Sequence, residues 1–542
     1  MPFPPALLLL VPLAYLVAAS LPETLFAAAP ERRWTLSLTT SALSWLLALV
    51  AAVAVATGGG GVERLSLPTA LAALAPTARL DALTVVMLVL ITGIATVILR
   101  FSRRYLDGEP GRPRYVRWFM ATMAGASLLV VTDDLFVLAL AWTASSLTLH
   151  QLLTFYGDRA PALVAAHKKF LLSRAADVAI LAAVALVWRT MGTQRIDALL
   201  AQAAAMREAP ATLEVAGVLL VAGVALRSAQ LPFHGWLIQV MEAPTPVSAF
   251  LHAGIVNIGG FVLIRLAGLV GRLEGAQTLL VIVGTTTAVL AALVMTTRVS
   301  VKVSLAWSTC AQMGFMLVEC GLGAYGLALL HLVAHSLYKA HAFLSSGRAV
   351  EQQLTRRMTP LVAPTTALHW SLSAVSAVLV VLVVGSALGM VTHGDVGTIA
   401  AALIMTFALA PLFLRGVSGD VGALLHGVGA ATMLVATFSA GHALFSAVAP
   451  TVHGAPAMDA MRLAIVASAF VALYATQATI AVQPTGQLAR VLYPACYAGF
   501  YLDELCTRLT FRMWPPRGLP VPVPVLASRA ASTVRHLKEL HA

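Results

Sequence analysis

The stretch from Arg227 to Arg265 constrains the fold more than any other, because it places helix breakers inside a run of apolar helices. Pro232, Pro244 and Pro246 each remove a backbone hydrogen-bond donor from this stretch. Within a bilayer, a broken helix is tolerated only where the freed backbone groups pack against protein or line a wet cavity. The stretch therefore predicts either a broken membrane helix beside a polar path or a re-entrant turn at the membrane surface.

The same stretch carries five ionisable side chains, which are Arg227, His234, Glu242, His252 and Arg265. On insertion scales a charged residue at the centre of a membrane helix costs about 2.5–3.5 kcal/mol, and such residues usually mark the path of an ion or a proton. We therefore expect this part of the chain to contribute to a functional site.

The composition predicts an all-α polytopic membrane protein. Of the 542 residues, 59% are hydrophobic and only 11% are charged, whereas soluble proteins carry about 25% charged residues. The apolar runs have helical length and lack the alternating pattern of a membrane β-barrel. A net charge of +12 is typical of a membrane protein that retains Arg and Lys in its cytoplasmic loops, so it does not imply nucleic-acid binding.

Apolar runs predict about fifteen transmembrane helices. They lie near 3–20, 35–56, 81–100, 117–131, 135–155, 168–189, 212–230 (broken and continuing to about 240), 246–268, 277–297, 302–320, 325–347, 366–391, 397–414, 421–445 and 461–482. Basic residues in the connecting segments number seventeen on one side and seven on the other. This bias predicts an N-terminus outside and a C-terminus in the cytoplasm.

The segment 484–542 is predicted to leave the bilayer as a cytoplasmic tail. It begins amphipathically, from Tyr493 to Trp514, and then becomes Pro-rich and finally basic. An amphipathic segment of this kind lies along the membrane surface or against a partner.

Three ionisable residues follow one another at intervals of four in the helix near 325–347: His331, His335 and Lys339. This spacing places them on one stripe of the helix. Because histidine titrates near neutral pH, the stripe could pass a proton along. A structural polar seam and a metal site are the alternatives, although no carboxylate or thiol lies near these residues in sequence.

Two further polar sets lie in the first half of the chain. Arg174 and Asp177 are three residues apart, a spacing that allows an ion pair on one helical face. Thr143 and His150 are seven apart and also share a face. For each set, a structural role and a role in a relay remain open.

Cofactor and metal motifs are lacking in the sequence. The four cysteines, at 310, 320, 496 and 506, form no CxxC pair. The sequence also contains no P-loop and no HExxH motif. We therefore predict no cofactor and no metal in this chain.

Four segments carry a resemblance to a known family: AAHKKFLLSRAADV (165–178), RSAQLPFHGWL with EAPTPVSAFLHAG (227–254), VKVSLAWSTCAQMGFM (301–316) and HLVAHSLYKAHAFLSSG (331–347). The chain resembles the antiporter-like subunits of respiratory NADH dehydrogenase (NuoL) and of Mrp sodium/proton antiporters. That resemblance implies two inverted five-helix repeats, each with a broken helix, around a hydrated path. It suggests N-terminal helices in 1–115, repeats in 116–270 and 271–420, and C-terminal helices in 421–483.

The resemblance also implies roles for individual residues. Arg227 occupies the position of the family's central lysine, and Thr143 that of its glutamate. Because a guanidinium does not deprotonate in practice, the family's Lys–Glu proton switch cannot run here in its usual form. The predicted proton path comprises Lys339, His335, His331, His252, Arg227, His150, Asp177, Arg174, His234 and Glu242.

The closing segment YAGFYLDELCTRLTFRMWPP resembles the tail of the DabB membrane subunits of inorganic-carbon accumulation systems. This resemblance implies a conductor of cations, with protons expected, in the inner membrane of a bacterium. It would couple the proton motive force to CO2 hydration and bicarbonate accumulation by a DabA-like zinc subunit on the cytoplasmic side.

Several alternatives remain open. The chain could instead be an antiporter subunit of a respiratory or Mrp-type complex, or a membrane scaffold with a closed channel. The sequence does not decide between H⁺ and Na⁺. If the first half of the path conducts, His150→Leu and His252→Leu should each reduce transport, whereas a closed first half leaves both variants unaffected.

Overall fold

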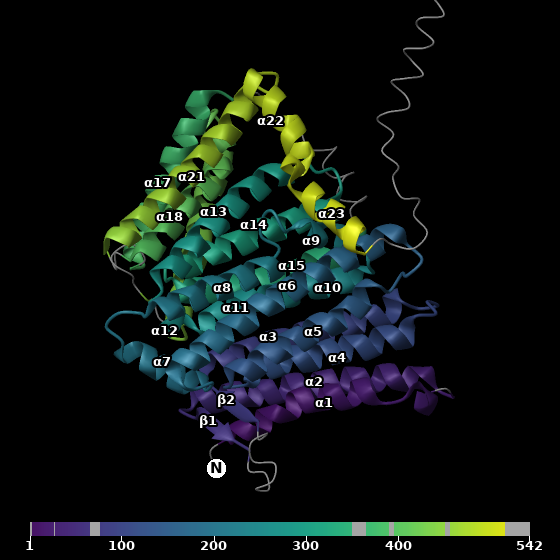
Figure 1. The fold of residues 1–542 in the computed structure, drawn as a ribbon. Helices are drawn as coiled ribbons and strands as arrows, with labels where there is room; N and C mark the ends of the chain where they lie inside the picture. The colour runs from purple at the N-terminus through teal and green to yellow at the C-terminus, as the bar shows by residue number, and fades with distance from the viewer. Residues whose placement is uncertain are drawn as a thin grey trace, which may run out of the picture.

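The computed structural model describes residues 3–26, 28–65, 76–348, 365–389, 395–449, 452 and 456–514. In this part of the chain, long helices run side by side in one bundle. The N-terminal helices lie at one edge and the C-terminal helices at the opposite edge (Figure 1). The predicted all-α antiporter-like fold is confirmed, and the predicted boundaries of the repeats, at 115, 270 and 420, remain predictions.

A helix occupies each of the stretches in which one was predicted. In chain order the long helices are α1 (Leu10–Ser20), α2 (Pro30–Ala56), α3 (Ala82–Tyr105), α4 (Arg112–Val131), α5 (Leu135–Leu153), α6 (Ala160–Met191), α8 (Ala211–Arg227), α10 (Thr245–Ala253), α11 (Ile258–Arg265), α13 (Glu274–Met295), α14 (Val301–Gly321), α15 (Tyr325–Leu344), α17 (Ala367–Ala387), α18 (Val396–Leu409), α20 (Val421–Ser446) and α21 (Pro456–Val482). Among the described residues, eleven helical segments are long and apolar enough to cross a membrane. The number of fifteen crossings remains a prediction.

Side chains at the helix ends explain several of these boundaries. The Asp81 carboxylate accepts a hydrogen bond from the Thr84 amide at 2.8 Å and so caps α3. Asp134 caps α5 in the same way, with the Val137 amide at 2.9 Å. Such caps satisfy amide groups that have no partner within their own helix.

Three helices are interrupted in the structure. After α8 ends at Arg227, the chain turns and resumes as α9 (Gly235–Gln239) and the short η4 (Val240–Glu242). The helix predicted near 246–268 is instead divided into α10 and α11 by η5 (Ile255–Asn257). Likewise η7 (Ala410–Phe413) separates α18 from α19 (Leu414–Val417). Two of these three interruptions lie where the helix pattern predicted continuous helices.

Close packing of α13 and α14 positions part of the polar site. A Cβ atom built on Gly284 would lie only 2.6 Å from the carbonyl oxygen of Gly314, which is too close for any side chain. The backbones of α13 and α14 can therefore pack this closely only because both residues are glycine. Small residues that allow such close approach are typical of membrane-helix interfaces. The contact fixes α14, whose other faces carry Thr309 and Glu319.

Neither a β-hairpin nor a separate helix directly after α6 was predicted from the sequence. Strands β1 (Gly61–Arg64) and β2 (Thr77–Leu80) form an antiparallel hairpin, and α7 (Ile196–Ala205) follows α6. Isolated bridges connect Ala78 with Thr132 and Asp134 with Arg195. The hairpin, the turn between α4 and α5, and the start of α7 therefore lie together at one end of the bundle.

The amphipathic part of the predicted tail forms two helices, α22 (Gln487–Tyr497) and α23 (Leu502–Met513), joined through η8 (Gly499–Tyr501). In Figure 1 they follow α21, and α23 extends past α9 toward the end of the bundle. The Pro-rich and basic part of the predicted tail, beyond residue 514, lies outside the described residues.

Candidate functional site

The predicted stripe on α15 faces the interior of the bundle. Lys339 is fully buried, and its ammonium group donates a hydrogen bond to the carbonyl oxygen of Leu305 on α14 at 2.9 Å. His335 is also buried, and its ring centroid lies 6.0 Å from that of His331. The stripe therefore brings three ionisable groups to one inward face of α15, as its spacing predicted.

A carboxylate terminates this stripe. His331 Nδ1 lies 2.8 Å from the Glu319 Oε2 atom of α14, and the Glu319 side chain is only 5% exposed. Sequence reasoning found no carboxylate near the stripe, because Glu319 precedes it by twelve residues across the turn between α14 and α15. Two facing helices therefore supply one polar row, in which Glu319 can accept a proton from His331.

His252 joins the row from α10. It is completely buried, its Nδ1 atom lies 3.0 Å from the Thr309 hydroxyl group, and its ring stacks on Phe343 with centroids 4.5 Å apart. Within the described part of the chain, the Nε2 atoms of His252 and His335 have no hydrogen-bond partner. Each of these nitrogen atoms can accept or release a proton without breaking a hydrogen bond within the described part of the chain.

In the first half of the chain, Asp177 is the centre of a charged cluster. Arg174 pairs with it at 2.7 Å, as the spacing predicted, and Arg227 forms a second ion pair with the same carboxylate. The Thr143 hydroxyl group donates to Asp177 at 2.9 Å, and the Arg227 guanidinium lies over the Trp142 ring. Two permanent cations therefore hold the single carboxylate of this cluster.

Sequence reasoning missed Lys169. The seventeen basic residues counted on one side of the membrane include Lys168 and Lys169, which this count places in a connecting segment at the start of the helix predicted near 168–189. This assignment is wrong: α6 begins at Ala160, and both lysines are buried within it. Lys169 donates to the carbonyl and hydroxyl oxygens of Ser146 on α5, both at 2.7 Å. The signal was present in the sequence, because Lys169, Ser173 and Asp177 follow one another at intervals of four.

His150 lies near the end of α5, beside the C-terminal strap that α22 and α23 form. Its ring lies 6.4 Å from that of His167 and 6.1 Å from that of Trp514, while Trp514 stacks on His167 at 3.9 Å. The face that His150 shares with Thr143 points toward α6, because Thr143 contacts Asp177 and His150 lies beside His167. An aromatic residue of the strap covers this end of the first-half cluster.

The strap is held to α6 by a buried ion pair. The Lys168 ammonium group donates to both oxygens of Asp503, at 2.9 and 2.7 Å, and to the Thr507 hydroxyl group at 2.8 Å. Gln239 of α9 also donates to Asp503, at 3.2 Å. Because only 1% of the Lys168 side chain is exposed, removal of Asp503 would leave a buried charge without a partner.

The turn after α8 satisfies part of the backbone that the break frees. The Leu231 amide donates to the Thr287 hydroxyl group at 3.1 Å, and the Gln230 amide donates to the Ala225 carbonyl group. His234 is buried in this turn, whereas Glu242 is exposed at the end of η4. The structure therefore brings neither Glu242 nor His234 into the α15 row or the Asp177 cluster.

In the described residues, no three His, Cys, Asp or Glu side chains come together in a geometry that could hold a metal ion. The arrangement instead provides two buried polar clusters. One contains titratable histidines and a lysine, and the other contains an arginine–carboxylate network with a lysine beside it.

Comparison with known proteins identifies the family. Residues 132–394 match the model of the NADH:quinone oxidoreductase/Mrp antiporter membrane domain. Residues 70–116 match the model of the N-terminus of chain 5 of NADH-ubiquinone oxidoreductase (complex I). The fold is similar to that of a chain in the Mrp complex from Dietzia sp. DQ12-45-1b, with a TM-score of 0.58 and 23% identity. That match covers 99% of this chain and 60% of the Mrp chain.

Two curated relatives are more similar in sequence. "Probable inorganic carbon transporter subunit DabB2" of Halothiobacillus neapolitanus is 38% identical, over 83% of each chain. "Probable inorganic carbon transporter subunit DabB" of Hydrogenovibrio crunogenus is 40% identical, over 81% of this chain and 83% of its own. The chain is thus a multi-pass, antiporter-like membrane subunit, and it belongs to the family of the DabB inorganic carbon transporter subunits.

Proposed function

We propose that this chain conducts protons through the membrane and thereby couples the proton motive force to CO2 hydration by a partner subunit. The observation that carries this proposal is the buried row formed by Lys339, His335 and His331 with Glu319 and His252. Ionisable groups are expensive in an apolar bundle and persist where an ion or proton pathway needs them.

The row has the chemistry that proton transfer requires. Histidine can take up a proton on one ring nitrogen and release one from the other. His331 and His335 are neighbours, and Lys339 lies one turn further along the same face of α15. Thr309 orients the ring of His252 from α14. Water between these groups would complete the path.

The chemistry of inorganic carbon explains why such a path is useful. Hydration of CO2 produces bicarbonate and a proton, and inward proton flow down the proton motive force would supply the free energy that keeps this reaction from reversing. The curated relatives are named as inorganic carbon transporter subunits. Since the described residues bring no set of metal ligands together, we place the catalytic zinc in a DabA-like partner.

We place the partner on the cytoplasmic side of a bacterial inner membrane, with the N-terminus of this chain outside. The bias of basic residues supports this orientation. On the proposed cytoplasmic side, the strap covers the inner end of α6 through the contact of Lys168 with Asp503. A partner bound at this end would lie next to His150 and His167.

A role as an antiporter subunit of a respiratory or Mrp-type complex is the second candidate. The match of residues 132–394 to the shared antiporter domain favours it. This role also requires conduction through the buried row, but it requires different partners.

Purification of the full chain from its native membrane in a mild detergent separates the two candidates. We expect a zinc-containing protein to co-purify in a fixed ratio, and we expect purified complexes in vesicles to form bicarbonate at a rate that depends on the proton gradient. Recovery of the chain alone, or together with quinone-reductase subunits, would contradict the proposed coupling to CO2 hydration.

A further inference from the structure

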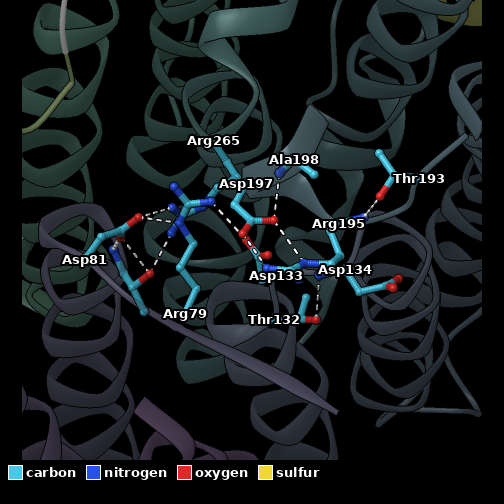
Figure 2. Close-up of polar contacts among 11 residues, drawn as sticks. Arg79, Asp81, Thr132, Asp133, Asp134, Thr193, Arg195, Asp197, Ala198 and Arg265 are labelled. Atoms are coloured by element: carbon cyan, nitrogen blue, oxygen red, sulfur yellow. Dashed lines mark hydrogen bonds and ion pairs between the residues drawn. The ribbon is translucent and has the colours of Figure 1, made fainter. Parts of the chain in front are cut away.

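A second group of charges lies at the opposite end of the bundle from the strap, where the β-hairpin, the turn before α5 and the start of α7 meet. Figure 2 shows these side chains in a row that runs from Asp81 through Arg79 and Arg265 to Asp133, Asp197 and Arg195. None of them belongs to the predicted proton path. Two of the acidic residues, Asp133 and Asp197, come from different elements and approach each other.

Asp133 is the most buried acidic residue of this group. Its side chain is 0% exposed, and its Oδ1 atom accepts a hydrogen bond from Arg79 at 2.9 Å. The other oxygen, Oδ2, is buried and has no hydrogen-bond donor among the described residues. The Asp197 side chain lies next to this carboxyl group (Figure 2), and each of the two carboxyl groups shifts the pKa of the other. Two carboxyl groups can form a hydrogen bond with each other only if one of them carries a proton, because an ionised carboxylate has no donor.

Asp197 is the partner that stays ionised. Its Oδ1 atom accepts hydrogen bonds from the Arg195 guanidinium at 3.1 Å and from the Ala198 amide at 2.6 Å. Burial acts to raise the pKa of Asp197, but these donors outweigh it and hold the pKa below its usual range. Burial raises the pKa of Asp133 to about 6; Asp197 adds to the rise, and Arg79 opposes it.

The remaining charges around the pair are engaged with other groups. Asp81 pairs with both Arg79 and Arg265, each at 2.6 Å. Its pKa therefore lies below the usual range, because the two guanidinium groups outweigh the effect of burial. Asp134 adjoins the pair in sequence but caps α5. Among Asp81, Asp133 and Asp197, Asp133 is the one whose pKa lies above its usual range.

Backbone hydrogen bonds hold together the two segments that carry these carboxyl groups. The Ile196 amide donates to the carbonyl oxygen of Asp133 at 2.8 Å, and the Leu135 amide donates to that of Gln194, also at 2.8 Å. These bonds fix the start of α7 against the turn between α4 and α5. If both carboxyl groups were ionised, their repulsion could not be relieved by a simple rotation of α7.

We propose that Asp133 and Asp197 form a proton-binding site, in which one proton from the aqueous phase at this end of the bundle is shared between the two carboxyl groups. The bound proton turns the pair into an O–H···O hydrogen bond that connects α7 to the turn before α5. Loss of the proton replaces this bond with repulsion and weakens the connection. The site does not depend on the proposed transport function, because it lies outside the α15 row.

The experiment is a pH titration of the purified full chain in nanodiscs, followed by infrared difference spectroscopy of protonated carboxyl groups. We expect one protonated carboxyl group to titrate with a midpoint near the pKa of about 6 given above. Asp133→Asn should abolish this signal, and Asp197→Asn should lower its midpoint by about one pH unit, because a neighbouring negative charge is removed. Asp134→Asn is the matched control, since asparagine also caps a helix, and should leave the midpoint unchanged.

The melting temperature gives a second readout. Because the folded-state pKa of Asp133 lies above its value in an unfolded chain, its contribution to stability is complete below about pH 4 and is lost as the pH rises through about 6. The melting temperature of the wild type should therefore fall between pH 5 and pH 7, about one unit on either side of this pKa. Asp133→Asn should remove this step.

Two results would overturn the proposal. The first is a carboxyl signal near pH 6 that persists in Asp133→Asn. The second is an unchanged midpoint in Asp197→Asn. If neither variant folds, the wild type alone decides, since a melting temperature that stays constant from pH 5 to pH 7 also excludes the site.

Discussion

The two halves of the bundle contain buried lysines in similar settings but with different neighbours. Lys169 donates to the carbonyl oxygen of Ser146, and Lys339 donates to that of Leu305, in each case on the preceding membrane helix. Around Lys169 the charged groups are Asp177, Arg174 and Arg227, which neutralise one another in part. Around Lys339 they are histidines.

This difference separates fixed charge from exchangeable charge. A guanidinium stays protonated at any physiological pH, so the Asp177 cluster can hold helices together but cannot easily release a proton. Imidazole groups change charge close to neutral pH. The second half therefore has the composition of a proton conductor, whereas the Asp177 cluster of the first half is composed mainly of fixed charges, with Lys169 beside it.

The largest expected effect is on stability, through the cluster of Asp177 with Arg174 and Arg227. Asp177→Asn removes the carboxylate with which both arginines pair and leaves Arg227 buried without a counter-charge. We expect a loss of about 3 kcal/mol of stability, measured by thermal unfolding in detergent. The double variant Asp177→Asn/Arg227→Gln should recover part of the loss. A single variant that melts like the wild type would show that the cluster does not stabilise the first half.

The next largest effect is expected on proton flux through the row of ionisable residues on α15. Lys339→Ala should lower proton flux into vesicles by about a hundredfold, which is the typical contribution of a positioned proton-transfer group. His341→Ala is the matched control: it lies on the same helix with an exposed side chain and should leave the flux unchanged. Normal flux in Lys339→Ala would remove this residue from the path.

Lys169→Ala then tests whether the first half conducts at all. We expect about a tenfold lower flux, equivalent to about 1.4 kcal/mol in the barrier, because Lys169 is an exchangeable group buried beside the Asp177 cluster. A flux equal to that of the wild type would mean that the first half is closed.

The smallest effect is expected for His150→Leu. His150 is half-buried at the inner end of α5, beside Trp514, where water can replace it as a proton carrier. We expect a several-fold lower flux, with the largest deficit at low pH where the imidazole would carry a proton. Loss of flux as complete as in Lys339→Ala would show that the two halves contribute equally.

Much of the fold could be predicted because hydropathy and helix length are local properties. Helical spacing was sufficient to place His331, His335 and Lys339 on one face and to pair Arg174 with Asp177. Hydropathy could not show that Lys168 and Lys169 are buried, because two adjacent lysines before an apolar run are typical of a loop. Their burial depends on Ser146 and Asp503, which are distant in sequence.

Other features depend on contacts between elements that the sequence separates. Glu319 reaches His331 only because α14 and α15 are antiparallel and adjacent. The proximity of Asp133 and Asp197 depends on α7 and on the β-hairpin, whose short segments have no strong periodic pattern. Glu242 was predicted because it is an ionisable residue of the broken stretch, and position in that stretch alone does not fix which side of a turn faces the interior.

The ion pair between Lys168 and Asp503 has a consequence for biosynthesis. The two residues are 335 positions apart, so a ribosome that inserts helices in order delivers the lysine to the membrane long before its carboxylate exists. Until α23 emerges, Lys168 must remain at the lipid surface or in contact with water, since a buried charge without a partner costs about 3–5 kcal/mol. The inner end of the first half is thus completed only after almost the whole chain has been synthesised.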